Sequence, residues 1–373
     1  MPARVVCFGA TGYTGRLVAS ALVAAGVETI VAGRDAGRLS ALARELGDLE
    51  HVQADARDTS WLRRVLRRGD VLLSTVGPFA VHGDGAIEAA LEAGAHYLDC
   101  CGEPAFIRRV FAHYDPRARR ADVALLPAIG SDFVPGNLAA ALALEATEEP
   151  GSAVQVGYFM LGAGSLRQAL SSGTLASLAE ALLAPGFTFR DGRVSDEAGG
   201  RRSRAFEVDG RERWGISIGS TEALSLPHRY PSLREVDVYL GWLGDRSRHV
   251  PRLAAAGALA QRVPVLAPAQ RRLARSLASA SASAGVAGPD AARRAAVVTH
   301  VVAEALSPRR NVVARVALRG LNPYDYTAGI LAWVASRLAA DGVAVRGAAG
   351  PAEAFSVQDL VQGNAEAGMH VVS

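Results

Sequence analysis

The sequence contains no lysine, so all 40 of its basic residues are arginine in a chain of 373 residues. A Schiff-base mechanism needs a reactive lysine amine and is therefore excluded, as is a lysine general acid. No run of about 18 uninterrupted apolar residues occurs, so we expect no stable membrane insertion. The three cysteines are Cys7, Cys100 and Cys101. They form no CxxC pair and no Cys/His spacing typical of zinc, so we expect no metal site.

Charge is also nearly balanced, because the net charge is only +3 with neutral histidines. The arginine pairs fall on predicted helix faces and form no basic arm, so we expect no nucleic-acid partner. The chain begins directly on a strand pattern, without the charged and apolar segments of a secretory signal. Together with the unpatterned cysteines, this start predicts a cytoplasmic protein.

Strand and helix patterns alternate over about the first 130 residues. We predict strands at 4–8, 28–32, 50–54, 70–76, 96–100 and 122–128, with helical patterns between them. Short connections of this kind force parallel pairing with right-handed crossovers. The pattern therefore predicts an α/β fold with a Rossmann-type doubly wound parallel sheet.

The pattern changes after about residue 150 and predicts a second, mixed α/β domain. Residues 153–161 and 233–241 alternate like half-buried strands, and 295–306 and 311–320 flank a hairpin signal. We expect helices at 171–184 and within 252–290. Between them, we expect residues 186–220 to form loops with short strand-like pieces. The predicted domains are 1–150, 151–322 for substrate binding and dimerisation, and a helical 323–373 that can return to the first domain. The 233–241 strand can extend a sheet across a homodimer.

A glycine-rich turn follows the first predicted strand in the stretch GATGYTG, residues 9–15. In this context a bare backbone and a helix N-terminus predict binding of a dinucleotide pyrophosphate, with a purely structural turn as the alternative. The phosphate-binding residues are expected to be Gly9, Thr11, Gly12, Tyr13, Thr14 and Gly15.

Arg34 stands at the end of the second predicted strand, where an NAD-binding protein usually carries an acidic residue. A guanidinium at this point can pair with a 2′-phosphate, which predicts NADP(H) as the cofactor. Asp35 is an alternative ribose ligand, although a helix N-cap is the simpler interpretation. Asp55 is a candidate for the adenine end. The nicotinamide half is expected beside Val76, Gly77, Pro78 and Phe79.

Several stretches in order resemble the saccharopine dehydrogenase-like family, and most closely its bacterial branch that includes trans-acting enoyl reductases. The matching stretches are GATGYTG (9–15), AGR (32–34), TVGPF (75–79), HGDGAIEAALEAGAHYLDCCGE (82–103), IGSDFVPGNLAA (129–140), SSGTLAS (171–177), LPHRYPSLREVDVYLGW (226–242) and GLNPYDYTAGILA (320–332). The resemblance implies an NADP-binding domain, a mixed second domain, and hydride transfer to a C=N or conjugated C=C bond of a small-molecule substrate.

Four side chains near the carboxyl ends of the predicted strands are catalytic candidates. They are Asp132, Tyr97, Glu103 and His82, each of which also has a structural interpretation as a core, capping or surface residue. A positioned acid or hydrogen-bond donor would stabilise charge as the acceptor bond is reduced. Ser171–Thr174 is a further possible anion site at a helix start.

Two other functional classes share parts of this pattern. A short-chain dehydrogenase or sugar-nucleotide epimerase also begins with GxxGxxG, but it needs a Tyr-x-x-x-Lys pair, which a chain without lysine cannot supply. A non-catalytic NADP-binding scaffold or redox sensor remains the alternative to a reductase.

Overall fold

The computed structural model describes residues 3–147, 152–162, 164, 170, 171, 174, 186–252, 288–342 and 344–373. The helices expected at 171–184 and within 252–290 fall almost wholly outside these residues. The chain divides into two compact units. The first comprises Met1–Cys101, Phe106–Val134 and Pro323–His370, and the second comprises Gly102–Ala105, Pro135–Asn322 and Val371–Ser373. No helix in the described ranges is long and apolar enough to cross a membrane.

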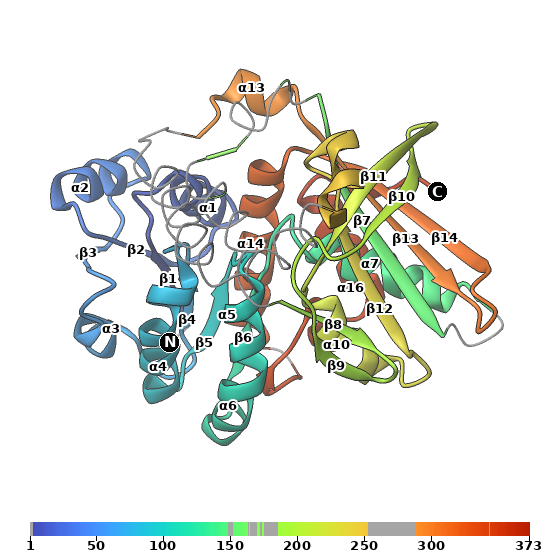
Figure 1. Cartoon of the computed structure of the whole chain (residues 1–373). Helices are drawn as coiled ribbons and strands as arrows, with labels where there is room; N and C mark the ends of the chain where they lie inside the picture. The colour runs from blue at the N-terminus through green and yellow to red at the C-terminus, as the bar shows by residue number, and fades with distance from the viewer. Residues whose placement is uncertain are drawn as a thin grey trace, which may run out of the picture. The chain divides into compact units, whose positions relative to one another are not determined.

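The first unit is built on a parallel sheet of seven strands in the order β15-β6-β5-β4-β1-β2-β3 (Figure 1). Its strands are β1 (Val5–Phe8), β2 (Thr29–Gly33), β3 (His51–Gln53), β4 (Val71–Ser74), β5 (His96–Asp99), β6 (Ala124–Leu126) and β15 (Gly347–Ala348). Every residue of β1, β4 and β5 is buried, as expected where helices cover both faces of a parallel sheet. The order confirms the predicted doubly wound sheet. Strands β1, β2 and β3 follow one another toward one edge of the sheet, and β4, β5 and β6 follow one another toward the other edge.

Helices connect these strands and continue into the second unit. The helical segments are α1 (Tyr13–Ala24), α2 (Ala36–Glu45), α3 (Ser60–Val65), α4 (Phe79–Ala93), α5 (Pro104–Arg109), η1 (Val110–Tyr114), α6 (Asp115–Ala121) and α7 (Val134–Glu145). Helix α4 begins at Phe79, so TVGPF runs directly into a helix.

The C-terminal helices of the first unit are α14 (Pro323–Ala340), α15 (Pro351–Ala354) and α16 (Val357–Glu366). Helix α14 packs beside α1, the helix that follows the glycine turn (Figure 1). At this contact the ring of Tyr324 meets the ring of Tyr13 edge-on, with centroids 4.9 Å apart. The C-terminal segment therefore braces the beginning of the glycine-turn helix.

The second unit contains a mixed sheet in the order β10-β11-β12-β7-β13-β14-β16, with β8 and β9 attached beside β12. The strands are β7 (Ala153–Leu161), β8 (Phe187–Arg190), β9 (Arg193–Asp196), β10 (Ser203–Val208), β11 (Arg211–Ile218), β12 (Glu235–Leu240), β13 (Val298–Leu306), β14 (Val312–Gly320) and β16 (Met369–Val371). Its other elements are α10 (Glu222–Arg229), η2 (Gly244–His249) and α13 (Ala291–Ala295). This sheet confirms the predicted mixed second domain.

Three expectations about the second unit differ from the structure. Residues 186–220 form four strands rather than mainly loops. Strand β12 pairs with β11 on one side and β7 on the other, so it has no free edge to extend a sheet across a dimer. Residues 153–159 are buried on both faces, because an aromatic cluster that includes Phe159, Phe206 and Tyr239 covers the face expected to meet solvent.

The two units also divide at a different place from the predicted boundary at residue 150. Almost all of α7 groups with the second unit, which begins at Pro135. Asn137 on this helix donates a hydrogen bond to Thr221 (3.1 Å) and accepts one from Ser225 (3.1 Å), and all three side chains are fully buried. Buried polar contacts of this kind, which sequence patterns do not reveal, fix α7 to α10.

Candidate functional site

The glycine turn between β1 and α1 is shaped by a backbone that tolerates no side chains at two of its glycines. Gly9 has φ of +90°, and a Cβ atom there would lie 2.7 Å from the Thr75 hydroxyl oxygen. A Cβ atom on Gly15 would overlap the backbone oxygen of Gly9. Gly9 therefore supplies a left-handed turn and Gly15 lets α1 approach β1 closely.

Gly12 is the N-cap of α1 and makes no side-chain capping bond, because it has no side chain. Its own N–H donates to the Gly9 carbonyl at 2.9 Å, which closes the turn. Backbone N–H groups in the first turn of a helix, together with the helix dipole, favour an anion. The turn thus has the geometry expected for a pyrophosphate beside residues 9–15.

Arg34 follows directly after β2 and is exposed to solvent. Asp35 is not poised as a ribose ligand in this structure, because its carboxylate caps α2 by accepting from the Arg38 N–H at 2.9 Å. The guanidinium of Arg38 donates to the carbonyl of Thr11 in the glycine turn at 2.8 Å. Two arginines therefore lie at or just after the end of β2, and Arg38, in the first turn of α2, is tied to the glycine turn.

Asp55 lies in the loop after β3 and is engaged by a near neighbour. Arg57 forms a 2.6 Å ion pair with it, and this contact lowers the pKa of the Asp55 carboxyl. The neighbouring positive charge of Arg34 acts in the same direction. The carboxylate is thus held ionised at the edge where adenine is expected.

The end of β4 is joined to the glycine turn by hydrogen bonds. Thr75 donates to the carbonyl of Phe8 both from its backbone N–H (2.9 Å) and from its hydroxyl (3.1 Å). Pro78 is the N-cap of α4, and Phe79 is buried against Phe106 with ring centroids 5.8 Å apart. The segment after β4 is therefore positioned beside the end of β1, as a nicotinamide-binding segment of this fold requires.

Asp132 lies in a tight turn between β6 and α7 that is held at several points. Ser131 donates its N–H to the Thr327 hydroxyl at 3.0 Å, and Phe133 adopts φ of +84°. Preceding the turn, the Asp99 carboxylate accepts from the Ala128 N–H at 2.7 Å. The turn carrying Asp132 is thus anchored to the carboxyl end of β5 and to α14.

The Asp132 carboxyl is only partly accessible, and desolvation by burial raises its pKa from 3.8 to about 7. A carboxyl group with a pKa near neutrality can hold or release a proton at physiological pH. Asp132 therefore has the electrostatic properties of a general acid, at the edge of the sheet where the nicotinamide half is expected.

The structure does not bring the other catalytic candidates into contact with Asp132. Tyr97 lies inside β5 with no exposed surface, and burial with the adjacent Asp99 raises the pKa of its phenol well above 10. His82 is half-buried in the first turn of α4, and no hydrogen bond joins it to Asp132 or Tyr97 in the described chain. Glu103 is fully buried in the short segment that groups with the second unit.

Three further polar side chains have contacts or burial that the structure describes. Ser171 accepts from the Thr174 N–H at 3.2 Å, while Ser172 and Gly173 between them are not among the described residues. The phenol of Tyr326 donates to Asn364 at 2.7 Å in the core of the first unit. His300 is buried in β13, and desolvation lowers the pKa of its imidazole.

Two features escaped the sequence patterns. Arg38 could have been found from its position four residues after Arg34, in the first turn of the predicted helix. The second is a buried pair in which Tyr158 donates to Glu222 at 2.5 Å, with desolvation raising the pKa of Glu222 to about 7. Nothing in the sequence indicates this pair, because its members lie 64 positions apart on β7 and α10.

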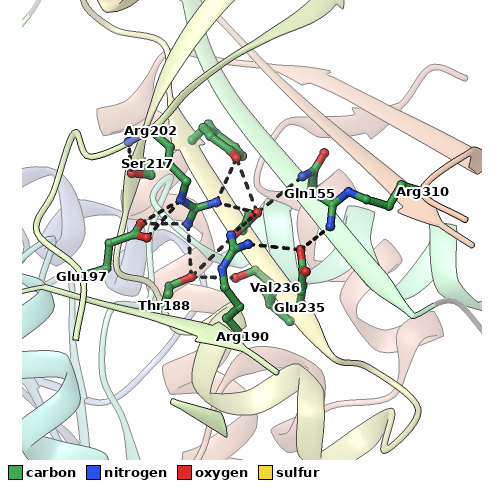
Figure 2. A network of polar contacts seen from close by, with 11 residues as sticks. Gln155, Thr188, Arg190, Glu197, Arg202, Ser217, Glu235, Val236 and Arg310 are labelled. Atoms are coloured by element: carbon green, nitrogen blue, oxygen red, sulfur yellow. Dashed lines mark hydrogen bonds and ion pairs between the residues drawn. The ribbon is translucent and has the colours of Figure 1, made fainter. Parts of the chain in front are cut away.

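The second unit also contains a network of arginines and acids around Asp237 on β12 (Figure 2). The buried Asp237 carboxylate pairs with Arg202 at 2.7 Å and Arg190 at 3.2 Å. Arg202 also reaches Glu197 (2.8 Å), and Glu235 pairs with Arg310 (2.8 Å). Each arginine already has an internal carboxylate, so this network ties the β8–β9 arm and the β13–β14 hairpin to β12 rather than offering free cations.

Comparison with known proteins agrees with this geometry. Residues 5–126 match the family model of the saccharopine dehydrogenase NADP binding domain. This match includes the glycine turn, Arg34 and the segment after β4, and it supports NADP(H) as the cofactor.

The chain is 33% identical over 140 residues to a trans-acting enoyl reductase of Mycobacterium tuberculosis, covering 36% of this chain and 34% of that protein. It is 32% identical over 146 residues to a lipid droplet localized protein of Caenorhabditis elegans, again covering 36% of this chain and 34% of the relative. The chain spans less than half the length of the curated relatives it matches.

Among solved structures, saccharopine dehydrogenase (L-Glu forming) from Saccharomyces cerevisiae aligns over 100% of both chains. The TM-score is 0.57 and the sequence identity is 14%. At this identity the match supports the fold alone, in which a doubly wound sheet is followed by a mixed-sheet unit.

Proposed function

We propose that this chain, whose residues 5–126 match the family model of the saccharopine dehydrogenase NADP binding domain, is an NADPH-dependent oxidoreductase. It would reduce a polarised C=N or a conjugated C=C bond of a small molecule. The observation that carries the proposal is the combination of a glycine turn for the pyrophosphate with a carboxyl group of pKa about 7 at the end of β6.

The cofactor would lie along the carboxyl edge of the sheet in the first unit. The pyrophosphate would meet residues 9–15, and the 2′-phosphate would meet Arg34 and Arg38. The nicotinamide would lie beside Val76–Phe79, at the point where the strand order reverses. Bound NADPH supplies the hydride, and the protein supplies position and electrostatic stabilisation.

Asp132 would act on the substrate rather than on the cofactor's phosphates. As hydride adds to a C=N or C=C bond, the atom at the other end of that bond gains electron density and takes a proton. A protonated Asp132 can donate this proton, directly or through one water, and its ionised form can hold a protonated imine. Tyr97, Glu103 and His82 stay weaker candidates, because two are fully buried and the third has no contact with Asp132.

The relatives named trans-acting enoyl reductases favour an enoyl substrate, while the family model's name favours an imine. The test is NADPH oxidation by the full chain with an α,β-unsaturated thioester and, separately, with a cyclic imine. Consumption of NADPH with one class would assign the bond type. Tight NADPH binding without turnover of either class would favour the alternative, an NADP-binding scaffold or redox sensor.

A further inference from the structure

A cavity in the second unit is separate from the cofactor site and is formed by the β8–β9 arm, α10 and the segment leading into β12. Its volume is about 360 Å³, within the roughly 300–1,000 Å³ range of small-molecule sites. Figure 1 shows β8, β9 and α10 side by side in this part of the chain. The cavity lies entirely within one unit, so its shape does not depend on how the two units are arranged.

The wall of the cavity is mainly apolar. Phe189 on β8, Leu224 on α10 and Leu233 before β12 are buried side chains that face it, and Val194 on β9 is 37% exposed at its border. Burying an apolar ligand against such a wall is favourable because it removes apolar surface from water. The wall therefore suits the hydrocarbon part of a ligand.

The charged groups at the cavity have a single sign. Arg193 and Arg234 line it, and no aspartate or glutamate does so among the described residues. Neither Arg193 nor Arg234 forms an ion pair within the described ranges, which distinguishes them from the neutralised arginines of Figure 2.

The position of Arg234 is fixed by the turn between β8 and β9. Gly192 donates its N–H to the Arg234 carbonyl at 3.1 Å, and a Cβ atom on this glycine would lie 2.9 Å from the Arg234 guanidinium. The guanidinium thus lies against the bare backbone of the turn. The next residue, Glu235, does not neutralise it, because that carboxylate pairs with Arg310 and Arg190.

We propose that this cavity is a second ligand site, which binds a small amphipathic anion with an apolar body against α10 and a carboxylate or phosphate against Arg193 and Arg234. The two guanidinium groups would hold the anionic end by charge-assisted hydrogen bonds. The proposal does not depend on the activity proposed above, because no cofactor-binding residue lines the cavity.

The test is calorimetric titration of the full chain with four probes of one chain length: octanoate, octyl phosphate, octanol and octylammonium. We expect both anions to bind at least about 10-fold more tightly than octanol, and octylammonium to bind least. The tighter of the two anions identifies the head group as a carboxylate or a phosphate. Equal binding of octanol or octylammonium, or no binding of either anion, would overturn the proposal.

Matched variants locate the binding. The double change Arg193→Gln and Arg234→Gln should weaken anion binding roughly 10-fold or more, whereas Arg211→Gln on β11 should leave it unchanged. Val194→Glu should also weaken it by placing a like charge at the border, whereas Val312→Glu, at an exposed valine on β14, should not. Circular dichroism and the thermal unfolding midpoint measured on each variant report an intact fold, and NADPH affinity measured separately distinguishes failure of this site from failure of the cofactor site. Unchanged octanoate affinity in the double variant would refute the assignment.

Discussion

Replacing Asp132 with asparagine should make the protein more stable at alkaline pH and less active. Burial raises the pKa of Asp132 from 3.8 to about 7, so the folded state binds this proton more tightly than the unfolded state. The folded protein therefore carries no cost from this group below about pH 4. The cost grows as pH rises toward 7 and is constant above it. At 1.36 kcal/mol per pH unit, the full cost is roughly 4 kcal/mol.

The Asp132→Asn substitution would remove the titration while keeping nearly the same side-chain volume. The gain in unfolding free energy over the unmodified protein should be larger at pH 8 than at pH 5, by roughly 2–3 kcal/mol. Urea denaturation at the two pH values measures this difference. Asp191→Asn, at an exposed hairpin turn, is the matched control and should show no such pH dependence. A gain that is equal at both pH values would refute a neutral, desolvated carboxyl at this position.

The same variant tests the chemistry. If Asp132 donates the proton, the single-turnover rate of NADPH oxidation should fall about 100-fold or more, with NADPH affinity nearly unchanged. Stability would then increase while activity is lost, as expected for a residue retained for function at a cost in stability. An unchanged rate would show that the carboxyl has no part in proton transfer.

Further substitutions test the cofactor turn and the second unit. Arg34→Ala should weaken NADPH binding about 10-fold or more and leave NADH binding nearly unchanged, as measured by fluorescence titration. Gly15→Ala should lower thermal stability and NADPH affinity, since its Cβ would overlap a backbone oxygen, whereas Gly37→Ala in α2 has ordinary contacts and should be tolerated. Asp237→Asn should lower the unfolding free energy by roughly 3 kcal/mol in urea, because it removes the buried negative charge that pairs with Arg202 and Arg190.

The first unit was predictable because its elements are specified locally. Each strand is a short apolar run, and the helices carry apolar faces such as Leu39 and Leu42 on α2, which are buried as the pattern predicts. The glycine turn was predictable for a related reason. Its function requires a bare backbone at fixed spacing, and this requirement is visible in the sequence itself.

The second unit was harder to predict because much of its structure depends on distant contacts. Two Asp-Gly pairs, Asp191-Gly192 and Asp209-Gly210, have positive φ at both residues and form the β8–β9 and β10–β11 hairpins. An Asp-Gly pair is the sequence signal of a two-residue hairpin turn, and here it lies in a stretch rich in glycine and arginine. By contrast, the pairing of β12 between β11 and β7 includes contacts between strands far apart in the chain, such as Val236 with Val154, which no local pattern contains.

The candidate site shows the same division. Arg34 and the glycine turn follow from local motifs, whereas the pKa of Asp132 depends on the burial that the folded chain provides. The sequence also does not show which side chains are accessible. Tyr97 was a catalytic candidate because it lies near the end of a predicted strand, but the folded sheet buries it completely.

We propose that the first unit binds NADPH through its glycine turn and that Arg34 contacts the 2′-phosphate. Fluorescence titration of the unmodified chain with NADPH and with NADH tests it most directly. NADPH should bind at least about 10-fold more tightly than NADH, the difference expected from a charge-assisted contact to the 2′-phosphate. Equal affinities for the two cofactors, or no binding of either, would contradict it.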